Sequence, residues 1–172
     1  TCALPILSDA QWAEVVAVCQ ERGLVPFLDM AYQGFADGIE ADAVAVRAFS
    51  KSGLQFFASS SFSKNFSLYG ERVGALSVVC ASKEEATRVL SQLKIAIRTN
   101  YSNPPTHGAQ IVATVLTTPA LRTMWEDELA AMRVRIKEMR TLLVEKLTAA
   151  GVQGDLSYIV RQKGMFSYSG LN

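Results

Sequence analysis

A serine-rich segment with one lysine contains the residue types best suited to chemistry. Residues 59–64 read Ser-Ser-Ser-Phe-Ser-Lys and directly follow a short apolar run that is typical of a buried strand. Hydroxyl groups and free backbone N–H groups just past a strand can bind phosphate. Lys64 could neutralise that phosphate, or its amine could act as a nucleophile. A P-loop is excluded because the glycines of that motif are absent.

Three residues outside this segment could complete a binding site. Arg72 offers a forked pair of donors that suits two oxygens of a phosphate. Asp29 ends a neighbouring apolar run, where a carboxylate is costly unless a cation such as a protonated pyridine nitrogen pairs with it. Tyr32, three residues later, could donate a hydrogen bond to a phenolic oxygen. Together these groups would supply the contacts that pyridoxal phosphate needs.

Each of these residues also has a plain structural explanation. A serine-rich loop with one lysine is most often solvated surface, and an aspartate at a strand end is most often a turn residue. Arg72 by itself fits a surface charge, and Arg98 fits a cation beside the negative end of a helix dipole. Residue types and spacing therefore leave a cofactor site and a solvated surface both open.

The elements that would hold these residues alternate between helix and strand over the first hundred residues. This order favours an α/β sheet with crossover helices, in which ligands bind beyond the carboxyl ends of the strands. Asp29 and the segment 59–64 lie at two such ends. Periodicity and capping predict helices over 9–22, 40–50 and 83–98, and buried strands over 24–29, 54–60 and 73–80.

After about residue 100 the sequence becomes helical. A short helix is expected over 107–117, and a long one from Pro119 to about Ala150 with Thr118 as its N-cap. A strand is expected over 157–161. The long helix would lead into a second subdomain. Its apolar residues recur every three or four positions, which predicts one face against a core or a partner: Trp125, Leu129, Met132, Ile136, Met139 and Leu143.

Composition excludes several classes of function. With 172 residues, of which 49% are hydrophobic, the chain is about one domain in size and can build a core. A net charge of +1 gives no electrostatic basis for binding nucleic acid or an anionic membrane surface, and no apolar run has transmembrane length. The three cysteines form no Cys-x-x-Cys pair and there is one histidine, so we expect no metal site. This use of cysteine favours a reducing, cytoplasmic setting.

Three separated motifs carry a family resemblance. They are Asp-x-Ala-Tyr-Gln-Gly-Phe at 29–35, Ser-Phe-Ser-Lys-Asn-Phe-x-Leu-Tyr-x-Glu-Arg-Val-Gly at 61–74, and Arg-x-Asn-Tyr-Ser-Asn-Pro-Pro at 98–105. In order, gaps and residues they resemble the class I aminotransferases, most closely the aspartate and aromatic-amino-acid branch. The resemblance implies the α/β fold of the aspartate aminotransferase-like proteins (fold type I). Residues 8–118 would be the last part of the cofactor-binding large domain, and 119–172 the connecting helix and the beginning of the small domain.

The resemblance also implies roles for the residues that would bind pyridoxal phosphate. Lys64 resembles the lysine that bonds to the cofactor and then moves a proton between the substrate Cα and the cofactor. Asp29 resembles the partner of the pyridinium nitrogen, and Tyr32 the phenol that bonds the O3′ oxygen. The phosphate group would be held by Ser61, Ser63 and Arg72.

Further residues would contact the substrate or a second subunit. Arg98 resembles the arginine that reaches across a dimer interface to the distal carboxylate of a dicarboxylic substrate, a task that suits its bidentate fork. Ser102 and Asn103 lie in the same interface loop. The implied activity is transamination between aspartate or an aromatic amino acid and a 2-oxo acid such as 2-oxoglutarate, by a cytoplasmic homodimer. A decarboxylase or lyase of the same fold and a non-catalytic fragment are the alternatives.

The sequence departs from the family at both ends. Members carry Asn-Pro-Thr-Gly about 28 residues before the aspartate, where this chain has Thr1-Cys2-Ala3-Leu4, so residues 1–7 are expected to be a foreign leader. The aromatic residue that stacks on the cofactor and the arginine for the substrate α-carboxylate are expected outside the chain. The isolated chain is therefore predicted to be catalytically incompetent, or nearly so. Ser67 replaces a glycine of many members and is small enough to fit.

Overall fold

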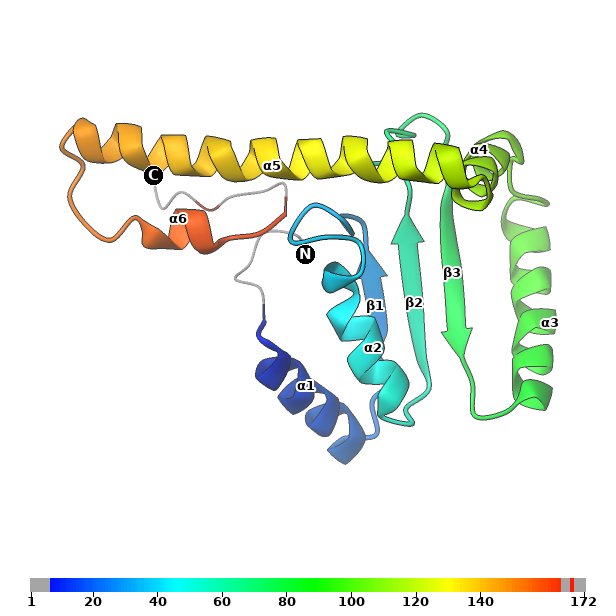
Figure 1. The fold of residues 1–172 in the computed structure, drawn as a ribbon. Coiled ribbons are helices and arrows are strands. Elements are labelled where there is room, and N and C mark those ends of the chain that lie inside the picture. Colours follow the sequence, from blue (N-terminus) through cyan, green and yellow to red (C-terminus); the bar gives the residue numbers. More distant parts are fainter. Residues whose placement is uncertain (1–6, 165–167, 169–172) are drawn as a thin grey trace.

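The computed structural model describes residues 7–164 and 168 (Figure 1). The leader expected over residues 1–7 lies outside the described residues except for Leu7. Most predicted helices and strands are present, with bounds shifted by a few residues. In chain order the elements are α1 (Asp9–Glu21), β1 (Phe27–Met30), the 3-10 helix η1 (Ala41–Ala43), α2 (Val44–Lys51), β2 (Phe56–Ser61), β3 (Gly74–Val79), α3 (Lys83–Asn100), α4 (His107–Thr117), α5 (Pro119–Ala149) and α6 (Ser157–Arg161).

The three described strands form one sheet in the order β1-β2-β3. β1 and β2 are parallel, with Asp29 opposite Ser59, and η1 and α2 make the crossover that a parallel pair requires. β3 is antiparallel to β2, with Gly74 opposite Ser61. The expected crossover thus holds for β1 and β2 but not for β3. A crossover helix would carry the chain back to the start of the sheet before the next strand. The link over residues 62–73 contains no helix, so β3 runs back beside β2 in the opposite direction.

The apolar core lies between α1, α2 and the amino half of β2. Phe49 of α2 and Phe56 of β2 are both about 1% exposed, and their ring centroids are 5.8 Å apart. Trp12 of α1 packs edge-on against Phe49, with a centroid separation of 6.5 Å. This core fixes one end of the parallel strand pair and leaves the carboxyl ends available for other contacts.

Helix α5 crosses above the carboxyl ends of β1 and β2 (Figure 1). Leu129 of α5 is fully buried, and the Arg133 guanidinium donates a hydrogen bond of 2.8 Å to the Gly34 carbonyl in the loop after β1. Gly34 has a φ of +99°, and a Cβ there would lie 2.4 Å from Leu129 Cδ2. Glycine is therefore required where α5 meets this loop.

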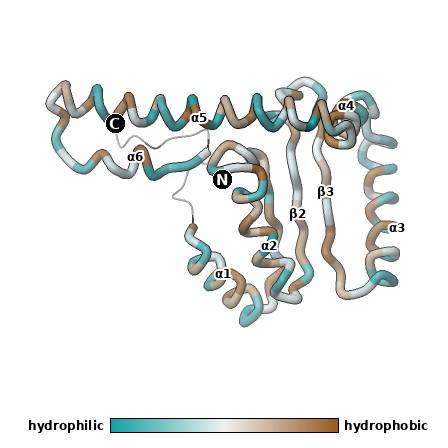
Figure 2. The backbone as a smooth tube through the Cα atoms, viewed as in Figure 1, coloured by the Kyte–Doolittle hydropathy of each residue, from teal (hydrophilic) through white to brown (hydrophobic). Residues whose placement is uncertain are grey.

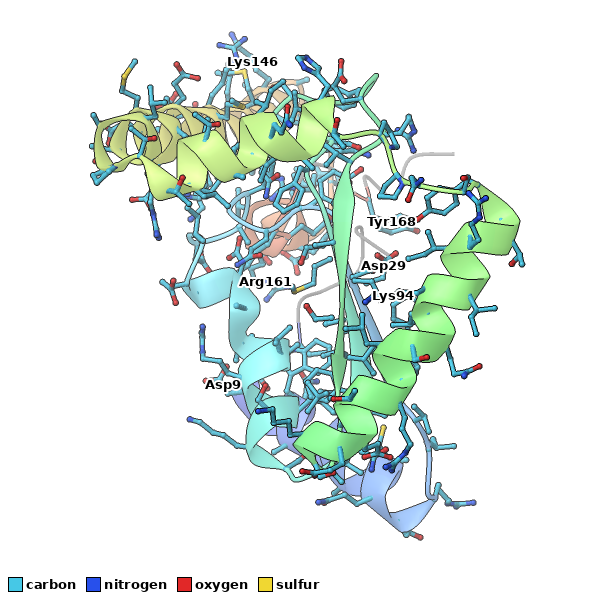
Figure 3. All side chains as sticks on the ribbon, turned by 90° about the vertical axis from the view of Figure 1, so that its right-hand side faces the viewer. Asp9, Asp29, Lys94, Lys146, Arg161 and Tyr168 are labelled. Carbon is cyan, nitrogen blue, oxygen red and sulfur yellow. The ribbon has the colours of Figure 1, made fainter. Side chains whose placement is uncertain are left out.

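Helix α3 stands beyond β3 in Figure 1 and runs diagonally in front of the sheet in Figure 3. The predicted apolar face of α3 is only partly covered, since Val89, Leu93 and Ile97 are half-buried. Among the described residues no helix is both long and apolar enough to cross a membrane.

Two strand predictions are corrected. Residues 157–161 form the helix α6 rather than a strand, because Asp155 Oδ1 accepts a 2.8 Å hydrogen bond from the Ser157 N–H group and starts a turn. The first strand begins at Phe27 rather than Leu24. Leu24 and Val25 are exposed, and Pro26 has no N–H group to donate to a sheet.

Two predictions about burial are also corrected. β3 was expected to be a buried strand, but residues 74–77 are exposed, because in the described part of the chain only β2 pairs with it. The apolar stripe of α5 is covered at Trp125, Leu129 and Ile136 and exposed at Met132, Met139 and Leu143. Figure 2 shows hydrophobic and hydrophilic turns alternating along α5. The stripe therefore packs in part on the sheet and the loops above it.

Candidate active site

The carboxyl ends of β1 and β2 bring Asp29 and Ser59 together. The two residues lie opposite each other in the parallel register, and the Ser59 hydroxyl donates a hydrogen bond to Asp29 Oδ1. Asp29 is otherwise exposed and is labelled on the sheet in Figure 3. Its carboxylate is thus fixed in direction and open to a cationic partner. The sequence placed Ser59 in the serine-rich segment but did not predict its contact with Asp29, because that contact depends on strand register.

Lys64 lies in the turn that follows β2. The turn is closed by a 3.0 Å hydrogen bond from the Ser67 N–H group to the Lys64 carbonyl. Lys64 Nζ is 5.3 Å from the ring centroid of Tyr32 and 5.7 Å from that of Tyr69. In the part of the chain that the structure describes, no carboxylate forms an ion pair with this amine. Two phenol faces therefore surround the amine, and a ring face attracts an ammonium group.

Tyr32 is positioned by a loop that Asp42 holds. Asp42 Oδ2 accepts hydrogen bonds from the Gly34 and Ala36 N–H groups at 2.8 and 3.0 Å, and Oδ1 accepts one from Asp37 at 2.9 Å. The Tyr32 ring packs edge-on against buried Phe35, with centroids 6.4 Å apart. Asp42, which sequence analysis missed, holds the loop that carries Tyr32. An acidic residue in the first turn of a helix beside a glycine-containing loop was the available signal.

The residues predicted to bind phosphate are only partly assembled. Ser61 Oγ accepts a 3.2 Å hydrogen bond from the Ser63 N–H group, so the two serines share one turn, and Ser63 is buried. Arg72 is exposed, and its Nη1 donates a 2.9 Å hydrogen bond to the Tyr69 carbonyl. Among the described residues, no contact joins the guanidinium to either serine.

Helix α5 contacts the residues next to Lys64. The Trp125 Nε1–H group donates a 2.6 Å hydrogen bond to the Asn65 carbonyl, and the Trp125 ring stacks on Phe66 with a centroid separation of 4.6 Å. Asn65 is buried and donates a 3.4 Å hydrogen bond to the Gln33 carbonyl. Its Oδ1 atom has no hydrogen bond within the described ranges. Trp125, expected to be a core residue, thus also anchors the lysine turn.

A cavity of about 730 Å³ lies beside β1 and reaches the two residues predicted to contact the cofactor ring. Its lining includes Asp29, Tyr32, Trp12, Arg47, Asp37 and Lys163. Asp37 accepts hydrogen bonds from Lys137, at 3.0 Å, and from Lys163. The hydrogen bond from Lys163 lowers the pKa of Asp37, partial burial opposes that shift, and Lys137 adds to it. This charge cluster joins the loop after β1 to α5 and to the segment after α6.

Arg98 lies in the last turn of α3, and Ser102 and Asn103 lie in the segment that follows it. The Arg98 guanidinium donates a hydrogen bond to the Ser102 hydroxyl, and Ser102 has a φ of +69°. Arg98 and Asn103 are exposed. α3 lies on the far side of β3 from β1 (Figure 1). Within the described residues, no contact brings Arg98 to Asp29, Tyr32 or Lys64.

Comparison with known proteins identifies the fold and the family. An aromatic-amino-acid aminotransferase from Burkholderia pseudomallei, whose structure is described as covalently bound to pyridoxal phosphate, superposes with a TM-score of 0.95 at 66% identity, over 96% of this chain and 42% of that one. The structure is therefore an α/β portion of an aspartate aminotransferase-like, fold type I protein. The sequence model of the family described as "Aminotransferase class I and II" matches residues 5–172. The chain belongs to this family, as the motifs predicted.

Curated relatives give the same assignment. The chain is 63% identical over 160 residues to the aspartate aminotransferase of Pseudomonas aeruginosa, and 53% identical over 166 residues to the tyrosine aminotransferase of Klebsiella pneumoniae. These alignments cover 93% and 96% of this chain but only 40% and 42% of the relatives. The chain therefore spans about two fifths of the length of the relatives it matches.

Proposed function

We propose that the chain carries the lysine-bearing half-site of a pyridoxal phosphate-dependent amino acid aminotransferase. The observation that carries the proposal is the position of Lys64, whose Nζ lies 5.3 Å from the ring centroid of Tyr32. Tyr32 follows β1, the strand that contains Asp29. The fit of the cofactor rests on the chemistry of this donor set. An amine, a phenol and a fixed, open carboxylate match an aldehyde, a phenolic oxygen and a ring nitrogen.

Each residue would have a separate task in the reaction. When bound, pyridoxal phosphate supplies an electrophilic carbonyl and an electron-withdrawing ring. The amine of Lys64 would hold the cofactor through its aldehyde carbon and would move a proton from the substrate Cα. Asp29, held by Ser59, keeps a proton on the ring nitrogen, and Tyr32 donates a hydrogen bond to the phenolic oxygen.

The phosphate group would be bound by Ser61, Ser63 and Arg72. Burial of Ser63 supports this assignment, because a hydroxyl removed from water binds an anion without competition from solvent. Arg72 uses Nη1 for the Tyr69 carbonyl and keeps its remaining N–H donors for a phosphate oxygen. The guanidinium would therefore hold the anion and the loop together.

Substrate binding would require a second copy of the protein. Arg98 is exposed and does not contact the lysine group of its own chain, which supports the proposal that it serves the site of a partner in a homodimer. Ser102 would orient its guanidinium, and Asn103 would lie in the same interface. The proposed substrates are aspartate or an aromatic amino acid, with a 2-oxo acid as acceptor, and the proposed location is the cytoplasm, where the enzyme would act in amino acid metabolism.

The proposed domain division places 8–118 in the large domain and 119–172 in the connecting helix and small domain. The position of α5 supports it, because Arg133 bonds the Gly34 carbonyl while Arg140 bonds the carbonyls of Gln162 and Gly164. We expect the isolated chain to be inactive, or nearly so, in transamination, since the α-carboxylate clamp would lie elsewhere in the whole protein.

Cofactor retention tests the proposal directly. The chain is mixed with pyridoxal phosphate, desalted, examined by visible absorption, reduced with borohydride and digested to map the modified lysine. We expect a stable visible band and a label on Lys64. Lys64→Ala should abolish the band, whereas Lys94→Ala, which removes an exposed lysine of α3, should leave it unchanged. A label scattered over surface lysines would contradict the proposal.

A further inference from the structure

Tyr69 contacts two charged residues of the proposed site, Lys64 and Arg72. Its ring centroid lies 5.7 Å from Lys64 Nζ, and its backbone carbonyl accepts a 2.9 Å hydrogen bond from Arg72 Nη1. Tyr69 thus connects the amine to the guanidinium. The ring is 51% exposed, so its place beside Lys64 is not explained by burial in a core.

The backbone around Tyr69 is held in an uncommon conformation. Ser67 and Arg72, which flank it, have φ angles of +54° and +52°, in the left-handed region that residues with a Cβ rarely adopt. Such angles persist only where the surroundings fix them, and they are frequent at binding and catalytic sites. A hydrogen bond of 3.2 Å from the Glu71 N–H group to the Leu68 carbonyl closes the turn between them.

Helix α4 supports the same loop from behind. Gly108 is buried at the start of α4, and a Cβ there would lie 3.0 Å from Glu71 Cβ and 3.1 Å from Val73 Cβ. This close approach fixes the segment that carries Tyr69 against the rest of the fold. The loop that carries Tyr69 beside Lys64 is therefore packed against α4.

We propose that Tyr69 is a positioning residue for Lys64. Its ring face attracts the ammonium group and keeps Nζ beside Tyr32, while its carbonyl orients Arg72. The phenol hydroxyl is not needed for this role, which distinguishes Tyr69 from Tyr32. The effect of this positioning on cofactor binding rests on the proposed function. Tyr69 acts on the Lys64 ammonium group before it loses a proton and Nζ bonds to the aldehyde carbon with loss of water.

The contact itself can be tested without a cofactor. The lysines are reductively methylated with a ¹³C label, and the methyl signals are observed by NMR, with Lys64 assigned through Lys64→Arg. We expect the Lys64 signal to lie upfield of that of exposed Lys94, because two ring faces shield it. Tyr69→Leu should move it towards the Lys94 position, and Tyr69→Phe should not.

A matched control removes a tyrosine that is equally exposed. Tyr101 is also 51% exposed and lies at the end of α3, so Tyr101→Leu should leave the Lys64 signal in place. Circular dichroism checks the fold of every variant, and Tyr69→Met replaces Tyr69→Leu if the latter unfolds. An unmoved Lys64 signal in Tyr69→Leu would overturn the proposal. So would an equal movement in Tyr69→Phe, which keeps the ring.

The chemical consequence is measured with two aldehydes, pyridoxal and pyridoxal phosphate. Tyr69→Leu should slow bond formation at Lys64 several-fold with both, because the amine is then no longer held beside Tyr32, and Tyr69→Phe should restore the rate. Arg72→Ala should weaken the binding of pyridoxal phosphate and leave the binding of pyridoxal unchanged. Equal rates in wild type and Tyr69→Leu would contradict the positioning role. If neither aldehyde bonds to Lys64 in the wild type, the proposed function fails, while the NMR comparison still decides whether Tyr69 holds the amine.

Discussion

The Trp125 indole donates a 2.6 Å hydrogen bond to the carbonyl of Asn65, the residue next to Lys64. A residue of α5 thus holds the lysine turn from sixty positions away in the sequence. The stacking of Trp125 on Phe66 adds an apolar contact at the same place. The position of the reactive amine therefore depends on the docking of α5 above the sheet.

Trp125→Phe separates these two contacts. The variant keeps an aromatic ring against Phe66 and loses the hydrogen bond, so we expect the free energy of unfolding to fall by about 1 kcal/mol. Urea unfolding measures the change. Trp12→Phe is the control, because Trp12 contacts Phe49 through its ring and should lose less stability in this conservative exchange. An equal loss in the two variants would show that the hydrogen bond to Asn65 adds nothing.

Gly34→Ala should be strongly destabilising. The new Cβ would lie 2.4 Å from Leu129 Cδ2, at a φ of +99°. Strain and overpacking together predict a loss of about 2–4 kcal/mol in the free energy of unfolding. Gly23→Ala is the matched control, since Gly23 has a φ of +60° with nothing within 4 Å of a Cβ, and it should lose about 1 kcal/mol. Thermal unfolding of both variants tests this, and a similar loss in the two would refute the clash with α5.

The pH dependence of stability should report on Asp37. Hydrogen bonding to Lys163 lowers the pKa of Asp37 in the folded state. A lowered folded-state pKa contributes stability above the unfolded-state pKa of about 4, and that stability is lost as the pH falls through the folded-state pKa. Because Asp37 is two-fifths exposed, the contribution should be less than about 1 kcal/mol.

Unfolding measured between pH 2 and 7 checks this sign. Asp37→Asn should flatten the acid side of the stability profile and remove little stability at pH 2. Asp127→Asn, at an exposed site of α5 for which the described structure has no ion pair, should leave the profile unchanged. An Asp37→Asn profile parallel to that of the wild type would contradict the assignment to the Lys137 and Lys163 cluster.

Ser59→Ala should weaken cofactor retention without unfolding the chain. The Ser59 hydroxyl donates to Asp29 Oδ1, so its removal leaves the carboxylate free to turn away from a ring nitrogen. We expect pyridoxal phosphate to be retained several-fold less well after desalting, since a hydrogen bond to a charged group is lost. Ser60→Ala, at the neighbouring position of β2, is the control. Equal retention by the two variants would remove Ser59 from the site.

Local sequence signals determined most of the helices. Ser8 caps α1 as expected, Pro119 begins α5, and His107 begins α4. These boundaries are readable because a cap or a proline acts on its own turn. The family motifs also identified Lys64 and Asp29 as candidates, because residue types and spacing by themselves left a cofactor site and a solvated surface both open.

The tertiary structure decided which side chains meet. Ser59 meets Asp29 through strand register, Tyr32 meets Lys64 through the shape of the loop after β1, and Trp125 meets Asn65 through the docking of α5. It also left much of β3 exposed. Periodicity records whether a residue prefers one face of its own element. It carries no information about which distant element will cover that face, because that choice depends on the packing of the whole chain.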